Sequence, residues 1–342
     1  MSEIVTFGEI MMRLNPSSYL RFVQADSFEA NLAGGEANVA VSLANYGKDV
    51  SFVTKVPSHE IGEIVVREMR RNGVDTSSIL RGGKRLGVFY LEKGASQRAS
   101  KVIYDRENSS IAEAEPSEFD WEKILEDAKW FHFTGITPAL SDNMAKACEN
   151  ACAVAKKLGV TVSCDLNYRS KLWTKEKANA VMSKLMPYVD VCIANEQDAS
   201  DVFGISAKHT DIEGGQLDYD AYIDVARQLK DRFNFKKVAF TLRGSISASR
   251  NTWAGMIYDS KSDKAEFSKQ YDIAIVDRVG GGDSFGGGLI YALESNKDDT
   301  YSIEFAVAAS CLKHTIEHDF NLVNISEVET LMNGNGSGRV QR

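Results

Sequence analysis

Short runs of β-branched and other apolar residues alternate with helix-type stretches along most of the chain, and this alternation constrains the fold more than any other feature. Strands are predicted at residues 2–7, Ser51–Val56, Lys129–Phe133, Val160–Asp165, Val189–Ala194 and Lys237–Leu242. Helices are predicted at Glu60–Asn72, Asn143–Leu158, Lys175–Met186, Tyr219–Phe233 and Thr300–His314. The pattern predicts right-handed crossovers and a mostly parallel sheet covered by helices on both faces, which is an α/β fold.

Two stretches, near residues 15–33 and 84–106, interrupt this alternation. They contain strand-type segments, such as Gly87–Leu91 and Lys101–Tyr104, with no helix between them. We expect these segments to form a small antiparallel sheet that stands off the main one. A surface loop is predicted at Ser206–Gln216, and the glycine-rich end, Asn333–Arg342, is predicted to be a flexible tail.

With 342 residues, the chain has room for one large α/β domain or two smaller ones. Its 40 basic and 48 acidic residues give a net charge of −8, which argues against nucleic acid or an anionic membrane as a partner. No apolar run is long enough to span a bilayer, and the N-terminal residues lack the pattern of a signal peptide. The five cysteines include no Cys-x-x-Cys pair, and we expect Cys148 and Cys152 to be buried rather than metal-binding. These features predict a protein of the reducing cytoplasm.

Three consecutive glycines, Gly280–Gly282, lie between an extended run, Ile273–Val279, and a helix-type run, Ser284–Ser295. Glycine lets the backbone turn tightly against a ligand, and the start of a helix presents unpaired N–H groups at the positive end of its dipole. This combination predicts an anion site, most often one for phosphate. Asp283 would repel a bound phosphate unless it accepts a proton from the group that attacks it. The stretch therefore predicts phosphoryl transfer, with Asp283 as general base and the Gly280–Asp283 amides as an anion hole.

Two better-known phosphate motifs do not fit these residues. A Walker A loop requires a lysine after its glycines, and none follows here; a dinucleotide-binding loop requires a third glycine where Phe285 stands. The remaining alternative is a structural turn in which Asp283 is an ordinary helix N-cap. The segment alone leaves that alternative open.

The segment Asp277–Asp283 resembles the C-terminal signature of the ribokinase-like (PfkB) carbohydrate kinases, Asp-Thr-x-Gly-Ala-Gly-Asp, with Arg278 in place of threonine and Gly281 in place of alanine. The resemblance implies a three-layer α/β/α kinase domain over residues 1–332, with lid segments at about 15–35 and 84–110 and the tail at 333–342. It also implies Asp283 as catalytic base, ATP and Mg²⁺ as cofactors, and a homodimer formed through the lid. It leaves open a requirement for a monovalent cation such as K⁺.

The resemblance also implies substrate contacts. Gly34-Gly35 with Asn38 is similar to the family's hinge and sugar-binding segment. Two arginines near one small site suggest a carboxylate, because a guanidinium can grip a carboxylate bidentately, although for either arginine alone a surface ion pair is the better interpretation. The motifs Tyr104–Ser110 and Asp165–Arg169 look like those of the subgroup that phosphorylates the 6-hydroxyl of 2-keto-3-deoxygluconate. The implied substrate-binding residues are Gly34, Gly35, Asn38, Tyr90, Tyr104, Arg106, Asn167, Arg169 and Asp283.

The nucleotide side is less close to the family pattern. Asn195 and Asp198 match the family's Asn-x-x-Glu with aspartate for glutamate, so a water-mediated metal role is expected for Asp198. Thr241 replaces a lysine, and His318 stands where the subgroup commonly has glycine. The implied ATP-binding residues are Asn195, Thr241, Arg243, Gly244, Gly280, Gly282 and His314.

Three alternatives remain at this stage. The first is a fructokinase- or ribokinase-like enzyme of the same family, against which the pair Arg106 and Arg169 argues. The second is a non-catalytic sugar-binding regulator on the same fold, against which the intact glycines and Asp283 argue. The third is a dehydrogenase, against which the failed dinucleotide spacing argues. The sequence does not separate a gluconate-derived from a galactonate-derived keto acid.

Overall fold

The structure is a computed structural model that describes residues 2–206 and 219–334. The predicted surface loop, Ser206–Gln216, and the predicted tail, Asn333–Arg342, lie outside the described residues except for Ser206, Asn333 and Gly334.

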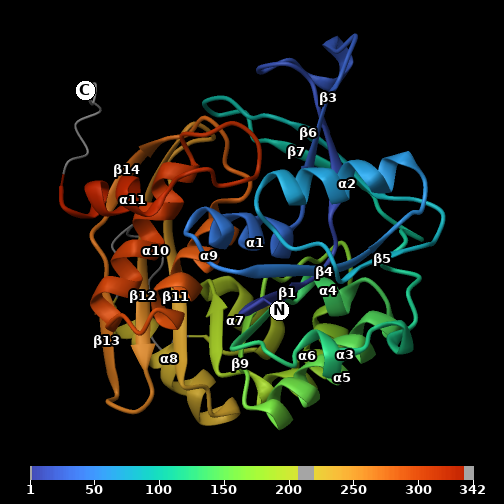
Figure 1. Cartoon of the computed structure of the whole chain (residues 1–342). Coiled ribbons are helices and arrows are strands. Elements are labelled where there is room, and N and C mark those ends of the chain that lie inside the picture. Colours follow the sequence, from blue (N-terminus) through green and yellow to red (C-terminus); the bar gives the residue numbers. More distant parts are fainter. Residues whose placement is uncertain (1, 207–218, 335–342) are drawn as a thin grey trace.

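A large sheet forms the centre of the molecule (Figure 1). Its strands lie in the order β13 (Lys264–Phe267), β12 (Arg250–Asp259), β11 (Lys237–Ser245), β10 (Val191–Ala194), β9 (Thr161–Asp165), β8 (Trp130–Thr134), β1 (Ile4–Phe7), β4 (Val50–Val56) and β5 (Ile79–Arg81), with β14 (Tyr271–Ala274) paired to β12. All strands from β11 to β5 run parallel, whereas β12, β13 and β14 pair antiparallel. The expected mostly parallel sheet is confirmed; the antiparallel strands β12 and β13 were not predicted.

Helices cover both faces of this sheet because its strands are apolar on both sides, as is usual for buried parallel strands. On β10, Val191 and Ile193 contribute to one hydrophobic core, and Cys192 and Ala194 contribute to the other. The first core is covered by α1 (Gly35–Asn45), α2 (Glu60–Arg71), α9 (Gly281–Glu294) and α10 (Asp299–Lys313), with α11 (Ile325–Met332) packed on α10. The second is covered by α5 (Asp142–Leu158), α6 (Lys175–Leu185), α7 (Glu196–Phe203) and α8 (Tyr219–Phe233).

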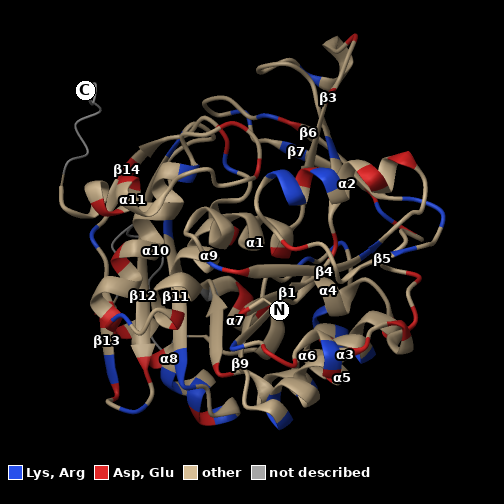
Figure 2. Ribbon diagram, viewed as in Figure 1, with Lys and Arg blue, Asp and Glu red and all other residues tan. Residues whose placement is uncertain are grey.

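Short helical segments complete the layers: α3 (Trp121–Ile124), α4 (Ile136–Ala139) and the 3₁₀ turns η1 (Phe22–Gln24), η2 (Pro116–Glu118) and η3 (Met186–Tyr188). All five cysteines are buried and none forms a disulfide, which confirms the packing role expected for Cys148 and Cys152. Within the described ranges, no helix combines the length and the apolar character needed to cross a membrane. Figure 2 shows acidic and basic positions interspersed along the ribbon.

A second, four-stranded sheet stands off the main one (top of Figure 1) in the order β3 (Glu29–Ala33), β2 (Met11–Asn15), β6 (Gly87–Glu92) and β7 (Lys101–Asp105). The expectation of a small separate sheet is confirmed, but the expectation that it is antiparallel throughout is wrong. Strands β2 and β6 pair in parallel, because the chain passes through the main sheet between them and no hairpin sets their direction. One face of this sheet, with Met11, Phe89 and Leu91, packs toward the carboxyl ends of the main parallel strands.

Candidate active site

The glycine turn lies where the end of α10 meets the start of α9. The backbone N–H groups of Val276 and Asp277 donate to the carbonyl oxygen of His314, at 2.8 and 3.3 Å. Gly280, with φ of +82°, is the N-cap of α9, and the helix begins at Gly281. The sequence placed this start at Ser284 and extended the preceding strand to Val279, and both boundaries are wrong. The strand ends at Ala274, since the N–H groups of Val276 and Asp277 bond to His314 instead of β12. A turn follows, in which the buried Asp277 side chain accepts a bond from Val279 N–H.

Close packing explains two of the glycines. A Cβ on Gly280 would overlap the carbonyl oxygen of Asp319, and a Cβ on Gly281 would overlap the ring of His314. Gly282 has open space around the same position. The turn is therefore supported tightly from behind, while the first N–H groups of α9, which have no helical partner, are left for a ligand in front of it.

Asp283 is the third residue of α9 rather than its N-cap, which rules out the structural alternative for this residue. Its Oδ2 accepts a hydrogen bond from Asn38 Nδ2 at 2.6 Å. Burial, together with the nearby carboxyl groups of Asp319 and Glu36, raises the pKa of Asp283 to about 6, against the lowering effect of Asn38. A carboxyl group with this pKa is mostly ionised at neutral pH and can accept a proton.

The Asn38–Asp283 bond joins the two glycine motifs of the sequence, which are 245 residues apart. Gly34 is the N-cap of α1, and its N–H donates to Asn38 Oδ1 at 3.4 Å. A Cβ on Gly35 would lie 3.6 Å from Asp283 Oδ1, so Gly35 borders the same carboxyl group. Gly34, Gly35 and Asn38 therefore lie together at one side of Asp283.

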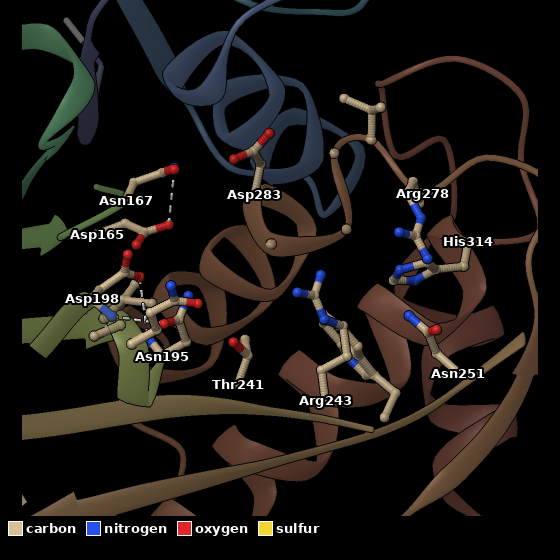
Figure 3. A pocket seen from close by; sticks show the side chains of 18 of the residues that line it. Asp165, Asn167, Asn195, Asp198, Thr241, Arg243, Asn251, Arg278, Asp283 and His314 are labelled. Atoms are coloured by element: carbon tan, nitrogen blue, oxygen red, sulfur yellow. Dashed lines mark hydrogen bonds between the residues drawn. The ribbon is translucent and has the colours of Figure 1, made fainter. Parts of the chain in front are cut away.

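A cleft of about 370 Å³, within the usual size of small-molecule sites, opens in front of Asp283 (Figure 3). It lies at the carboxyl ends of β9, β10 and β11, where ligands bind in sheets of this kind. Most predicted site residues line it: Asn167, Arg169, Asn195, Asp198, Thr241, Arg243, Gly280, Gly281, Gly282, Asp283 and His314. Gly244, the next residue on β11, is not among the lining residues.

Carboxyl groups gather on one side of this cleft (Figure 3). Asp198 is buried and accepts bonds from the N–H groups of Tyr168 (3.1 Å) and Asn195 (3.3 Å). Burial raises the pKa of Asp198. Burial also raises the pKa of Asp165, and the negative charges of Asp198 and Asp283 raise it further. A cation bound nearby would favour the ionised form of both carboxyl groups. Among the described residues, no group of three His, Cys, Asp or Glu side chains is placed to hold a metal ion directly.

Arginines gather on the other side. Arg243 extends from β11, and Arg278 lies beside His314 (Figure 3). The Nε and Nη2 atoms of Arg278 are buried and have no hydrogen-bond partner within the described part of the chain. Burial and the charge of Arg243 lower the pKa of Arg278. Burial also lowers the pKa of His314 to about 4, so this ring is neutral and packs beneath Gly281.

The small sheet forms a second side of the space around Asp283. Tyr104 on β7 faces this region together with Arg106 and Arg169. The buried Arg106 is paired with the buried Glu9, through Nε at 2.8 Å and through Nη2, and Ser109 also donates to Glu9. Arg169 donates only to the adjacent Tyr168 carbonyl oxygen and makes no ion pair within the described ranges. The two arginines that were expected to act together therefore differ, because the charge of Arg106 is already neutralised by Glu9.

Tyr90 is not brought to the site. On β6 it alternates with Phe89, which faces the site, so its side chain projects from the opposite face of the small sheet. Its ring packs against Phe28, with 6.0 Å between centroids. Successive side chains of a strand point to opposite faces, so Phe89 and Tyr90 cannot both face the site. The sequence alone does not say which of the two faces the site.

Several residues of the cleft had no role in the sequence interpretation. Asp165 and Arg278 lie inside the motifs Asp165–Arg169 and Asp277–Asp283, so their places in these motifs could have identified them as site residues. Asn251 and Trp253 on β12 and Glu9 after β1 carried no local signal, because they reach the site only through pairing of distant segments.

Known proteins resemble the chain over nearly its full length. A profile described as "pfkB family carbohydrate kinase" matches residues 1–317. A 2-dehydro-3-deoxygalactonokinase from Haloferax volcanii is 33% identical over 337 residues, which cover 98% of both chains. The crystal structure of a 2-dehydro-3-deoxygluconokinase from Thermotoga maritima is 51% identical, covers 97% of this chain and 98% of that one, and has a TM-score of 0.93. An E. coli structure described as a proposed ribokinase II with ATP and Mg²⁺ shares the fold at 19% identity, with a TM-score of 0.77 over 97% of this chain and 99% of that one.

Proposed function

The chain belongs to the pfkB family of carbohydrate kinases, and from this premise we propose that it transfers the terminal phosphoryl group of ATP to the 6-hydroxyl of 2-keto-3-deoxygluconate. The observation that carries the proposal is the position of Asp283. Its carboxyl group, with a pKa of about 6, lies directly beside the free N–H groups of a glycine-rich helix start. A proton acceptor next to an anion site is the arrangement that phosphoryl transfer to a hydroxyl requires.

We propose that the ATP phosphates lie between the glycine turn and the two arginines, Arg243 and Arg278. An anion between these two guanidinium groups relieves their mutual repulsion and supplies partners for the buried nitrogens of Arg278, which have none among the described residues. Asn195, Thr241 and His314 border the same space.

The acidic side of the cleft suits Mg²⁺. Burial raises the pKa of Asp165 and of Asp198, so a nearby cation would favour the ionised form of both, and both would hold the ion through water rather than in a closed set of protein ligands. When bound, Mg²⁺ offsets the charge of the phosphates. With Asp198 in place of glutamate, the shorter side chain is consistent with a water-mediated contact.

For the sugar acid, we propose that Gly34 and Asn38 contact the hydroxyl end and that Tyr104 and Arg169 contact the carboxylate end. Arg169 carries the charge that grips the carboxylate, because the charge of Arg106 is matched by Glu9. Arg106 then orients its partners and can still donate through nitrogens that do not bond to Glu9.

In the proposed reaction the 6-hydroxyl oxygen attacks the terminal phosphorus of ATP. The hydroxyl proton passes to Asp283, and the electron pair of the broken P–O bond leaves with ADP. Asn38 holds the Asp283 carboxylate in place, and the amides at the start of α9 stabilise charge on the transferring group. Closure of the small sheet over the substrate would exclude water that otherwise hydrolyses ATP.

The test is ADP release with MgATP and four acceptors, 2-keto-3-deoxygluconate, 2-keto-3-deoxygalactonate, fructose and ribose, and also with no acceptor. Both keto acids are included because the Thermotoga and Haloferax relatives carry the two different names. We expect turnover with keto acids only, faster with the gluconate-derived one, and a phosphorylated product by mass spectrometry. Preference for a neutral sugar, or silence with all acceptors in a protein that still binds ATP, would contradict the proposal. Asp283→Asn is the matched inactive control.

We also propose that the protein is a cytoplasmic homodimer formed through the outer face of the small sheet. This face, defined here by Tyr90, Ile103 and Phe28, exposes apolar side chains, with Ile103 and Phe28 53% and 42% exposed. Light scattering should give twice the chain mass of 37.7 kDa. Ile103→Asp should give a monomer, while Ile61→Asp, at an isoleucine of α2 that is 41% exposed, should not. A monomeric wild-type protein would contradict this proposal.

A further inference from the structure

Lys313 is a fully buried ammonium group whose partners are backbone carbonyl groups. It is the last residue of α10, its exposed fraction is 0%, and its Nζ donates to the carbonyl oxygens of Asp277 (3.5 Å) and Ile316 (3.3 Å). Within residues 2–206 and 219–334, no carboxylate oxygen lies within 4 Å of Nζ. Burying an ammonium group is costly, so this position calls for an explanation beyond packing.

The two carbonyl groups belong to the segments that support the anion hole. Asp277 begins the turn that leads to Gly280. Ile316 lies in the loop after α10, which continues to Asp319, whose carbonyl oxygen packs directly against Gly280. One turn before Lys313 on α10, Ser310 donates to the carbonyl oxygen of Gly281 at 2.6 Å. Lys313 therefore ties the turn to the loop from behind, on the side away from the cleft.

The charges around Lys313 also require a cation at this position. Asp277 and Asp319 are both buried, and both bond to the single guanidinium group of Arg13. Lys93 lies 3.4 Å from Asp277 but also pairs with the partly exposed Glu317. Without Lys313, the buried group of Arg13, Asp277 and Asp319 would place a net negative charge directly behind amides that must bind phosphate.

We propose that the Lys313 ammonium is a built-in monovalent cation, which holds the turn from Asp277 to Gly281 in shape and takes the position that a free potassium ion would need behind the anion hole. Carbonyl oxygens are the ligands that proteins use for K⁺, and an ammonium group carries the same charge. The requirement for K⁺ that the sequence left open is therefore met by the chain itself. Lys313 acts through the backbone, as a positioning residue, and its catalytic effect rests on the phosphoryl transfer proposed above.

The first test uses the wild-type protein. Turnover is measured at constant ionic strength with KCl, NaCl or tetramethylammonium chloride as the only monovalent salt. We expect the three rates to agree within about twofold, the usual scatter of such comparisons. A rate several times higher in KCl than in both other salts would overturn the proposal, because it would require a free K⁺ in addition to Lys313.

The second test removes the ammonium group. Lys313→Ala opens space for an ion, and Lys313→Met keeps the length of the side chain without its charge. We expect both variants to lose roughly tenfold or more in kcat, less than the ~hundredfold cost of a direct anion-hole donor. NH₄⁺ or K⁺ should restore part of the loss in Lys313→Ala but little in Lys313→Met, where the side chain still fills the space. Lys146→Met, at an exposed lysine of α5, is the matched control and should keep the wild-type rate.

A third measurement needs no substrate and so separates failure of this inference from failure of the proposed activity. The thermal midpoint of Lys313→Ala should rise with K⁺ or NH₄⁺ relative to Na⁺, and that of the wild-type protein should not. Crystals of Lys313→Ala soaked in RbCl should show an anomalous peak between the carbonyl oxygens of Asp277 and Ile316. A Lys313→Ala protein that folds, binds no ion there and keeps its wild-type turnover would refute the role assigned to Lys313.

Discussion

The hydrogen bond from Asn38 to Asp283 gives the sharpest prediction, because it links the proposed base to a residue that does not itself react. Asn38 Nδ2 lies 2.6 Å from Asp283 Oδ2 and lowers the pKa of that carboxyl group against the effect of burial. A hydrogen bond to a charged group contributes about 1.5–3 kcal/mol, and one pKa unit corresponds to about 1.4 kcal/mol. At the low end of that range, Asn38→Ala should raise the pKa of Asp283 by roughly one unit, from about 6 to about 7.

The base acts in its ionised form, so a raised pKa moves the loss of activity to higher pH. We expect the acid limb of kcat/KM to shift upward by roughly one unit in Asn38→Ala, so that at pH 6 the ionised fraction falls about fivefold. At pH 8.5 both proteins have an ionised base, and any remaining difference reports lost positioning. The assay is ADP release between pH 5 and 9, compared between variants because titration of ATP itself is common to all.

Asn45→Ala is the matched control, since Asn45 also lies on α1 and donates a side-chain hydrogen bond at 2.9 Å, but to the Asn321 carbonyl oxygen. Its acid limb should coincide with that of the wild type. An unshifted limb in Asn38→Ala would refute the reasoning, as would an equal shift in both variants, which would indicate a change in the whole fold.

Four further variants test the charges in the site. Asp283→Asn should lower turnover roughly a hundredfold or more and yet raise the thermal midpoint at pH 7.5. A carboxyl pKa raised from 3.8 to about 6 costs the folded state up to about 3 kcal/mol above pH 6, less where cleft water screens the charge. Below pH 4 the thermal midpoints of the variant and the wild type should converge, and calorimetry at both pH values checks this. Arg278→Leu should weaken binding of inorganic tripolyphosphate roughly tenfold by titration calorimetry without weakening binding of adenosine, and equal losses for both would contradict a phosphate contact. Arg169→Met should raise KM for the keto acid at least tenfold and leave KM for ATP nearly unchanged. Arg106→Met leaves Glu9 buried without its partner, so it should lower the free energy of unfolding by about 3–5 kcal/mol in chemical denaturation.

Local patterns in the sequence were sufficient for the fold class. Alternation of strand and helix periodicities predicted the parallel strands β1, β4, β8, β9, β10 and β11. It also predicted the helices on both faces, because continuous apolar strands must be covered on both sides. The strand β12 was missed because it begins with Arg250-Asn251-Thr252, polar residues that lack the apolar signature of a central strand. Its place beside β11 comes from antiparallel pairing, which no local pattern records.

The site was predictable where a motif carried it and not where distant segments meet. Asp283 and its glycines could be singled out because the chemistry of an acid beside an anion site is visible in seven residues. The pairing of Arg106 with Glu9, 97 positions away, was not visible, and it changes the expected role of that arginine. The place of Lys313 at the end of α10 gave no hint that its ammonium group would reach the carbonyl oxygen of Asp277.

The cleft gathers carboxyl groups on one side and arginines on the other (Figure 3), and this arrangement relates binding to stability. On one side the charge of Asp198 makes ionisation of the buried Asp165 more costly, while on the other Arg243 disfavours the charge of Arg278. A magnesium nucleotide would offset both groups at once, since the ion meets the carboxylates and the phosphates meet the arginines. The folded protein should therefore gain more from MgATP than from ATP or Mg²⁺ alone. A thermal midpoint that rises by more with MgATP than the sum of the two separate shifts would show this coupling, and simple additivity would show that the two charge groups act independently.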